Sequence, residues 1–218
     1  MPLISGDKIR LKISELFVSL QGEGPAAGYP AFFVRLSGCN LSCCWCDTPH
    51  ARQPETGQEM EMPKIINRFR KSGVSQVLIT GGEPLLQEGV YALMEELLAL
   101  GAQVFLETNG SLSLKRVPSE VTKVMDLKPP SSGMSKYMLY ENLRYLSHRD
   151  QIKFVIADEE DYRWAKEKVL GLGLNYFTEV SFSPAWGLMS PEKLAKMILR
   201  DRLPVRLQLQ LHKILKLP

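Results

Sequence analysis

Four cysteines carry the clearest chemical signal in this chain of 218 residues. They are Cys39, Cys43, Cys44 and Cys46, and all of them fall within one short segment. Disulfide bonds inside such a segment would close very small loops and would therefore add little stability. A compact group of cysteines is more typical of metal ligation or of redox chemistry.

The spacing of Cys39, Cys43 and Cys46 is C-x3-C-x2-C. Three thiolates with this spacing can hold three irons of a 4Fe–4S cluster and leave the fourth iron open to a small molecule. We interpret Cys44 as a packed thiol, because it lies too close to its neighbours to reach a separate iron. The alternative is a zinc knuckle in which His50 is the fourth ligand. A zinc knuckle usually serves a small domain, so the length of this chain favours the cluster.

The composition is that of a globular protein, with 44% apolar and 23% charged residues. The net charge of +3 is too weak to indicate a nucleic-acid partner. The most basic stretch, Arg206–Lys216, is interleaved with Leu and Gln and is predicted to be a strand with a solvated face. No apolar run approaches the roughly 20 residues that span a membrane, and Met1–Lys12 lacks the apolar centre of a signal peptide. We therefore expect a cytoplasmic protein.

Apolar runs rich in β-branched residues alternate with helical patterns along the chain. The predicted strands are Lys12–Ser19, Ala31–Leu36, Gln76–Thr80, Gln103–Glu107, Thr122–Leu127, Gln151–Ile156, Thr178–Phe182 and Val205–Leu211. The predicted helices cover residues 63–71, 86–100, 138–147, 159–170 and 191–202. This order predicts an α/β fold with parallel strands and crossover helices in one domain, residues 1–218.

Unusual residues follow the predicted strands at their carboxyl ends. These segments are Thr80–Pro84, Glu107–Gly110, Asp126–Gly133 and Ser183–Pro184. The carboxyl ends of parallel strands lie on one face of a sheet, and ligand sites are built there. We therefore expect the four segments to meet at one cavity.

The cysteine triad and the Gly81–Pro84 segment together resemble the signature of the radical S-adenosylmethionine superfamily. Within it, the chain is similar to the 7-carboxy-7-deazaguanine synthases from about residue 12 to its last residue. The segments that carry this narrower resemblance are Glu15–Pro25, Phe33–Leu41, Trp45–Thr48, Thr80–Pro84, Lys128–Gly133 and Gln208–Lys213. The fold that the resemblance implies is a partial, splayed β/α barrel.

The resemblance also implies cofactors and their ligands. Cys39, Cys43 and Cys46 would bind the 4Fe–4S cluster, whose open iron takes S-adenosylmethionine, and Thr48 would contact Mg²⁺. The residues implied to bind S-adenosylmethionine are Trp45, Cys46, Asp47, Gly82, Ser131, Ser132, Gly133, Ser183 and Pro184. The sequence alone favours Thr48 as a loop or capping hydroxyl, and a capping role explains the serines nearly as well as cofactor binding does.

The implied activity is that of a lyase in the queuosine and 7-deazapurine pathway. It contracts the ring of 6-carboxy-5,6,7,8-tetrahydropterin to give 7-carboxy-7-deazaguanine and ammonia. The implied substrate residues are Leu20, Gln21, Gly22, Arg35, Thr80 and Pro218. Among these, Arg35 suits the substrate carboxylate because a guanidinium binds a carboxylate through two hydrogen bonds, and Pro218 would bring the chain end into the site.

The partners that the resemblance implies are an electron donor such as flavodoxin or ferredoxin and a second copy of the chain in a homodimer. A rival within the superfamily is an activase that forms a glycyl radical on another protein. It would share the cysteine spacing and the Gly-Gly-Glu segment, but it would lack the loop Gln21–Gly24.

Overall fold

One nine-stranded sheet organises the computed structural model, which describes residues 9–218. Most of the segment Met1–Lys12, where no signal peptide is expected, therefore lies outside the described residues. The strands are β1 (Arg10–Leu20), β2 (Pro30–Leu36), β3 (Gln58–Glu61), β4 (Gln76–Gly81), β5 (Gln103–Thr108), β6 (Thr122–Asp126), β7 (Gln151–Ile156), β8 (Glu179–Pro184) and β9 (Arg206–Leu207). Their order across the sheet is β3-β1-β2-β4-β5-β6-β7-β8-β9.

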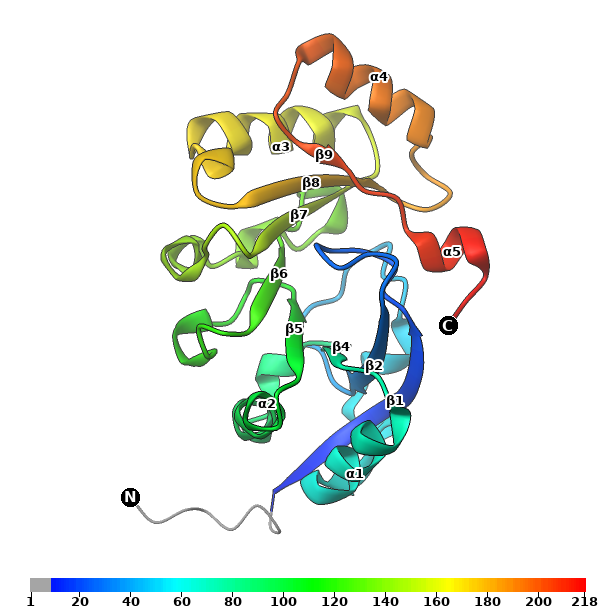
Figure 1. The fold of residues 1–218 in the computed structure, drawn as a ribbon. Helices are drawn as coiled ribbons and strands as arrows, with labels where there is room; N and C mark the ends of the chain where they lie inside the picture. The colour runs from blue at the N-terminus through cyan, green and yellow to red at the C-terminus, as the bar shows by residue number, and fades with distance from the viewer. Residues whose placement is uncertain (1–8) are drawn as a thin grey trace.

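The sheet is curved but does not close. Neighbouring strands from β2 to β9 are parallel, whereas β1 runs antiparallel to both β2 and β3. Figure 1 shows the strands as an arc that begins near β1 and ends at β9, with a gap between the two ends. The partial, splayed barrel is thus confirmed, with an antiparallel edge added to the expected parallel strands.

Helices cover the outer side of the arc, and the last one lies across its opening (Figure 1). They are α1 (Met62–Ser72), α2 (Gly89–Ala99), α3 (Glu159–Gly171), α4 (Pro191–Asp201) and α5 (Leu211–Leu215). The ends follow local chemistry: Asp158 caps α3 by accepting from the amide of Asp161, and Gly73 ends α1 in the left-handed conformation. No helix of residues 9–218 is long and apolar enough to cross a membrane.

Two predicted elements are wrong. Residues 138–147 do not form an α-helix; only the tighter 3-10 turn Tyr140–Tyr145 occurs there. The reason is Asn142, whose buried side chain accepts from Leu114 N and donates to Leu112 O. These contacts with the loop at Leu112–Leu114 determine the backbone conformation of the segment. The predicted strand Val205–Leu211 keeps only the two residues of β9.

The basic stretch Arg206–Lys216 is consequently not a strand with a solvated face. After β9 the chain leaves the sheet, because Leu211 N donates to the carbonyl of Gly22 at 3.0 Å instead of to another strand. The short helix α5 follows, and none of its residues is buried. Strand β3 was missed because Gln58–Glu61 is polar and forms the outer edge of the sheet.

The core lies between the sheet and the outer helices. All six residues of β7 are buried, and Phe154 at its centre packs edge-to-face against Phe182 of β8. Tyr162 of α3 packs on Phe182 in the same way, and its hydroxyl donates to the carbonyl of Met197 in α4. The outer helices are thereby fixed to the C-terminal half of the sheet.

Glu83 ties the carboxyl ends of β4 and β5 together. It is completely buried, and its carboxylate accepts from Thr108 Oγ1 at 2.9 Å and from the amides of Asn109 and Leu85 at 2.6 and 3.1 Å. Burial raises the pKa of Glu83 to about 6, because desolvation disfavours the charged form more than these hydrogen bonds favour it.

We predict that Glu83→Gln flattens the pH dependence of stability. A carboxyl whose pKa is raised by folding favours the folded state below its unfolded value near 4.5, and that advantage disappears as the pH rises through about 6. The contribution of Glu83 to the free energy of unfolding therefore falls by about 2 kcal/mol between these two pH values. Urea unfolding at pH 4.5 and 7 should show a smaller difference in unfolding free energy for Glu83→Gln than for the wild type. Equal differences in the two proteins would contradict this account.

Candidate cluster and substrate site

A cavity of about 760 Å³ lies at the carboxyl ends of the strands. Its wall is formed by the β1–β2 loop, the cysteine loop, the ends of β4, β5 and β6, and the C-terminal segment. The expected convergence is therefore confirmed for Thr80–Gly82, Glu107–Asn109 and Asp126–Lys128. Ser183 and Pro184 do not line the cavity, although the next residue, Ala185, does.

The three predicted cluster ligands share this cavity. Cys39, Cys43 and Cys46 are free thiols that line it, and all are partly buried. Cys44 also lines the cavity, but it is exposed, so the prediction of a packed thiol is wrong. Burial raises the pKa of the Cys39 and Cys43 thiols, so a bound metal would have to displace their protons. Free thiols spread around one cavity wall fit a cluster that offers each sulfur a separate iron.

Cys39 is oriented by its neighbours. Its sulfur accepts from the backbone amide of Leu41 at 3.5 Å and from the side-chain amide of Asn109 at 3.8 Å. Asn109 is itself held, because its side-chain oxygen accepts from Ser111. Hydrogen bonds to sulfur are a means by which proteins tune iron–sulfur clusters, so Asn109 is a positioning residue that sequence reasoning did not assign.

The zinc interpretation finds no support in this geometry. His50 Nε2 lies 3.1 Å from Glu15 Oε2, so this ring nitrogen is already engaged by a carboxylate. Within residues 9–218, no group of three or more His, Cys, Asp and Glu side chains converges as the ligands of a single metal ion do.

Gly81 and Gly82 allow two backbones to approach closely. A Cβ at Gly82 would lie 2.1 Å from the carbonyl oxygen of Gly38, and one at Gly81 would lie 2.1 Å from that of Leu36. Gly82 N donates to Leu36 O, and Glu83 N donates to Gly38 O. Because these amides are occupied, Gly82 can offer a ligand only its carbonyl oxygen, which suits an ammonium group.

Trp45 is fixed by polar contacts next to the cysteine loop. Its ring nitrogen donates to Ser131 Oγ at 2.9 Å, and Ser131 is bound in turn to the buried carboxylate of Asp161. The ammonium of Lys128 lies 5.4 Å from the centre of the Trp45 ring. Trp45 and Asp47 both line the cavity, as expected for residues beside a nucleoside.

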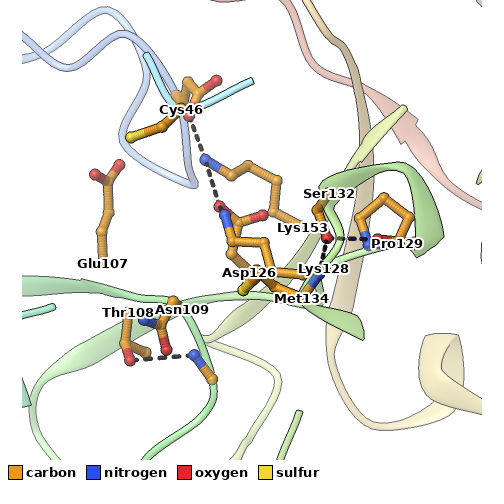
Figure 2. Close-up of polar contacts among 12 residues, drawn as sticks. Cys46, Glu107, Thr108, Asn109, Asp126, Lys128, Pro129, Ser132, Met134 and Lys153 are labelled. Atoms are coloured by element: carbon orange, nitrogen blue, oxygen red, sulfur yellow. Dashed lines mark hydrogen bonds and ion pairs between the residues drawn. The ribbon is translucent and has the colours of Figure 1, made fainter. Parts of the chain in front are cut away.

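The segment Ser131–Gly133 supports the cavity from behind instead of lining it. Ser132 is fully buried; its hydroxyl donates to Pro129 O and accepts from Met134 N, which closes a turn (Figure 2). Gly133 ends that turn with a φ of 73°. Their contact with the site passes through Trp45 and through the backbone amide of Cys44, which donates to Ser132 O.

Arg35 points into the cavity from β2 and is held on two sides. Its Nε lies 2.7 Å from Glu15 Oε2, and the guanidinium carbon lies 5.6 Å from the centre of the Phe17 ring. The Arg35 side chain is only 14% exposed. Because the ion pair uses Nε, the terminal nitrogens of the guanidinium can still bind a carboxylate in the cavity.

The residues of the predicted substrate loop do not all face the cavity. Leu20 and Gly22 line the cavity, but Gln21 does not: its amide nitrogen donates to Gln76 Oε1 at 2.8 Å. Thr80 also lines the cavity, and its hydroxyl donates to Glu107 Oε2 at 2.7 Å. Burial raises the pKa of Glu107.

Buried charges form a wall of the cavity that sequence reasoning largely missed. Lys153 of β7 contacts Glu23 of the β1–β2 loop and Asp126 of β6, and Asp126 also accepts from Lys128 at 2.9 Å. Figure 2 shows Lys153, Asp126 and Lys128 beside Glu107 and below Cys46. The available signal was a lysine in the middle of an otherwise apolar strand.

The C-terminal segment completes the wall. His212 and Pro218 both line the cavity, and the ring of His212 packs directly on Gly22, where a Cβ would lie 2.0 Å from His212 Nδ1. Burial lowers the pKa of His212, because desolvation disfavours the charged form of its ring. The tail and the β1–β2 loop therefore meet over the site.

The open sheet and its three-cysteine loop define a radical S-adenosylmethionine protein, and the Radical SAM superfamily matches residues 33–127. Proteins of this superfamily use a 4Fe–4S cluster and S-adenosylmethionine. The chain is 43% identical to the 7-carboxy-7-deazaguanine synthase of Chlorobaculum tepidum over an alignment of 206 residues. This alignment covers 93% of each of the two chains. The chain is 40% identical to the synthase of Methanospirillum hungatei, across 95% of this chain and 86% of that one. The chain belongs to the 7-carboxy-7-deazaguanine synthase family.

A solved structure agrees with the fold. The crystal structure of QueE from Escherichia coli matches with a TM-score of 0.75 at 23% identity, covering 94% of this chain and 96% of that one.

We predict that Cys39, Cys43 and Cys46 are each required for the cluster and that Cys44 is not. Substituting any of the three by Ala should abolish the brown colour, the bound iron and the acid-labile sulfide of anaerobically reconstituted protein. Cys44→Ala is the matched control and should retain all three properties, since Cys44 is exposed. Loss of iron from Cys44→Ala, or zinc in place of iron in the wild type, would overturn the ligand assignment.

Proposed function

We propose that this chain converts 6-carboxy-5,6,7,8-tetrahydropterin into 7-carboxy-7-deazaguanine and ammonia. The observation that carries this proposal is a single cavity that joins the cysteine loop to Arg35 and to a buried polar wall. The product equals the substrate less one ammonia, so the reaction needs no net oxidant. A cofactor that is regenerated in each turnover is compatible with that balance.

The cluster and S-adenosylmethionine, when bound, supply a reactive carbon radical that can remove a hydrogen atom from the substrate. Cys39, Cys43 and Cys46 would hold the cluster, and Trp45 and the Gly82 carbonyl would contact the nucleoside and amino-acid parts of S-adenosylmethionine. The chain contributes positioning and exclusion of water, because a reactive radical must meet only its intended C–H bond. The packing of His212 on Gly22 serves that exclusion.

The substrate would lie with its carboxylate toward Arg35. Glu15 and Phe17 hold the guanidinium in place, so little side-chain entropy is lost on binding. On the next two strands of the sheet, Thr80 of β4 and Glu107 of β5 form a hydrogen-bonded pair that can contact polar edges of the pterin ring. Burial raises the pKa of Glu107, because desolvation disfavours the charged form of this carboxyl.

Thr48 is the proposed protein contact of Mg²⁺. It occupies the N-cap position of a short 3-10 helix, but its side chain makes no capping hydrogen bond. Its hydroxyl lies 3.9 Å from Cys46 Sγ and faces the same cavity. Mg²⁺ retains several waters and takes few protein ligands, so one hydroxyl together with substrate oxygens is a suitable set.

The remaining proposals concern assembly and environment. The chain would act as one domain and as a homodimer, in a reducing cytoplasm, with flavodoxin or ferredoxin as electron donor. Four free thiols suit a reducing compartment. The exposed Cys44 brings the cysteine loop close to the surface, where a small electron carrier can approach it.

The decisive experiment is an anaerobic assay of reconstituted enzyme with the tetrahydropterin, S-adenosylmethionine, Mg²⁺ and a reductant. We expect 7-carboxy-7-deazaguanine and one ammonia per turnover. An absence of product with an intact cluster, together with hydrogen abstraction from a partner protein, would favour the activase instead.

We predict that Arg35→Ala raises KM for the tetrahydropterin by about 10- to 100-fold. A hydrogen bond to a charged group contributes roughly 1.5–3 kcal/mol, which corresponds to that range. The iron content should be unchanged, because Arg35 lies on β2 before the cluster ligands. Arg10→Ala is the control, since that arginine is 60% exposed on β1. An unchanged KM for Arg35→Ala would exclude the carboxylate-binding role.

We predict that the chain end must keep its position. Deleting Pro218, or adding one glycine after it, moves the terminal carboxylate and should raise KM for the substrate by about tenfold, which is 1.4 kcal/mol. A glycine added before Met1 is the control and should have no effect. Wild-type kinetics for both C-terminal variants would show that the terminus does not contact the substrate.

A further inference from the structure

Lys153 occupies an unusual place at the centre of the molecule. It lies on β7, in which all six residues are buried, and its own side chain is only 10% exposed. The ammonium nitrogen lies 2.5 Å from Glu23 Oε2 and 3.5 Å from Asp126 Oδ2. One lysine thus joins the β1–β2 loop to β6 and β7 inside the cavity wall (Figure 2).

Charge balance explains why these groups remain together. Burial alone would lower the pKa of Lys153, but Asp126 and Glu23 raise it well above its usual value. Burial alone would likewise raise the pKa of Asp126, and Lys128 and Lys153 bring it below its usual value. Removing one member of a buried pair leaves an uncompensated charge, which is more costly than the pair itself.

The loop that Glu23 belongs to is also held by hydrogen bonds to its backbone carbonyls on both sides of Glu23. Gly22 O accepts from Leu211 N, and Gly24 O accepts from the guanidinium of Arg206 at 2.9 Å. Among the described residues, the Lys153–Glu23 pair is the ion pair that joins a side chain of this loop to a strand of the sheet. Glu23 itself lines the cavity, as do Leu20 and Gly22 in the same loop.

We propose that Lys153 is a positioning residue that sets the β1–β2 loop for substrate binding by holding Glu23 and Asp126 at fixed positions. This inference rests on the proposed function, because the loop is assigned to the pterin. Lys153 acts through Glu23 and so affects how tightly the substrate is bound. The hydrogen-transfer step itself does not need it.

The chain offers a matched control in a second buried lysine. Lys123 lies on β6 with its side chain 5% exposed and is 3.3 Å from Asp150, but it does not line the cavity. Replacing either lysine by Met leaves one buried carboxylate without its cation. Only the Lys153 variant should disturb the β1–β2 loop.

The test is equilibrium binding of 7-carboxy-7-deazaguanine to cluster-loaded protein with S-adenosylmethionine and without reductant, followed by steady-state kinetics. We expect Lys153→Met to weaken binding at least tenfold and to raise KM similarly, with kcat within threefold of the wild type. Lys123→Met should bind the product like the wild type. In the double variant with Glu23→Gln, the loss should be clearly smaller than the sum of the two single losses.

Several results would overturn the inference. These are unchanged affinity in Lys153→Met, strict additivity with Glu23→Gln, an equal loss in Lys123→Met, or a fall in kcat with KM unchanged. If Lys153→Met does not fold, Glu23→Gln decides alone: it keeps the side-chain volume, and its product affinity must fall at least fivefold. A wild-type protein that neither binds the product nor consumes the pterin would contradict the proposed function instead.

Discussion

The close contact between the ends of β2 and β4 is the constraint on which the site depends. Two backbone hydrogen bonds, from Gly82 N to Leu36 O and from Glu83 N to Gly38 O, join these ends. Any side chain at Gly81 or Gly82 would collide with the neighbouring carbonyl. The contact holds the first residues of the cysteine loop against the sheet, and Glu83 joins the end of β4 to the end of β5 by hydrogen bonds to Thr108 and Asn109. The loop that carries the cluster ligands therefore begins at a fixed position on the sheet.

The cavity combines this rigid side with a wall of buried charges. Glu23, Lys153, Asp126 and Lys128 form a chain of ion pairs among residues that come from two loops and two strands. Such pairs add little to stability, because desolvation offsets most of their attraction. Their value lies in fixing geometry, which suits an enzyme that must keep a radical next to one carbon atom.

Much of the fold was predictable because apolar periodicity reports burial directly. Strand β7 was predicted with its observed ends, and the cysteine loop and Thr80–Pro84 indicated the site. Three features were not predictable. The conformation of segment 138–147 is set by the hydrogen bond from Asn142 to Leu112 O. The chain leaves the sheet after Leu207 and bonds to Gly22, and the side chain of Gln21 donates to Gln76. Each depends on a partner distant in sequence, which local patterns do not report. The same limit hid the Lys153 network, because Lys153 and Glu23 are 130 residues apart.

The attachment of the tail has a consequence for how molecules reach the interior. No residue of α5 is buried, whereas every residue of β7 is. Segments with little buried surface open at much lower free energy than the strands beneath them. We therefore expect the tail to separate from Gly22 at a lower free energy than the sheet unfolds, which would open the cavity on that side without disrupting the strands.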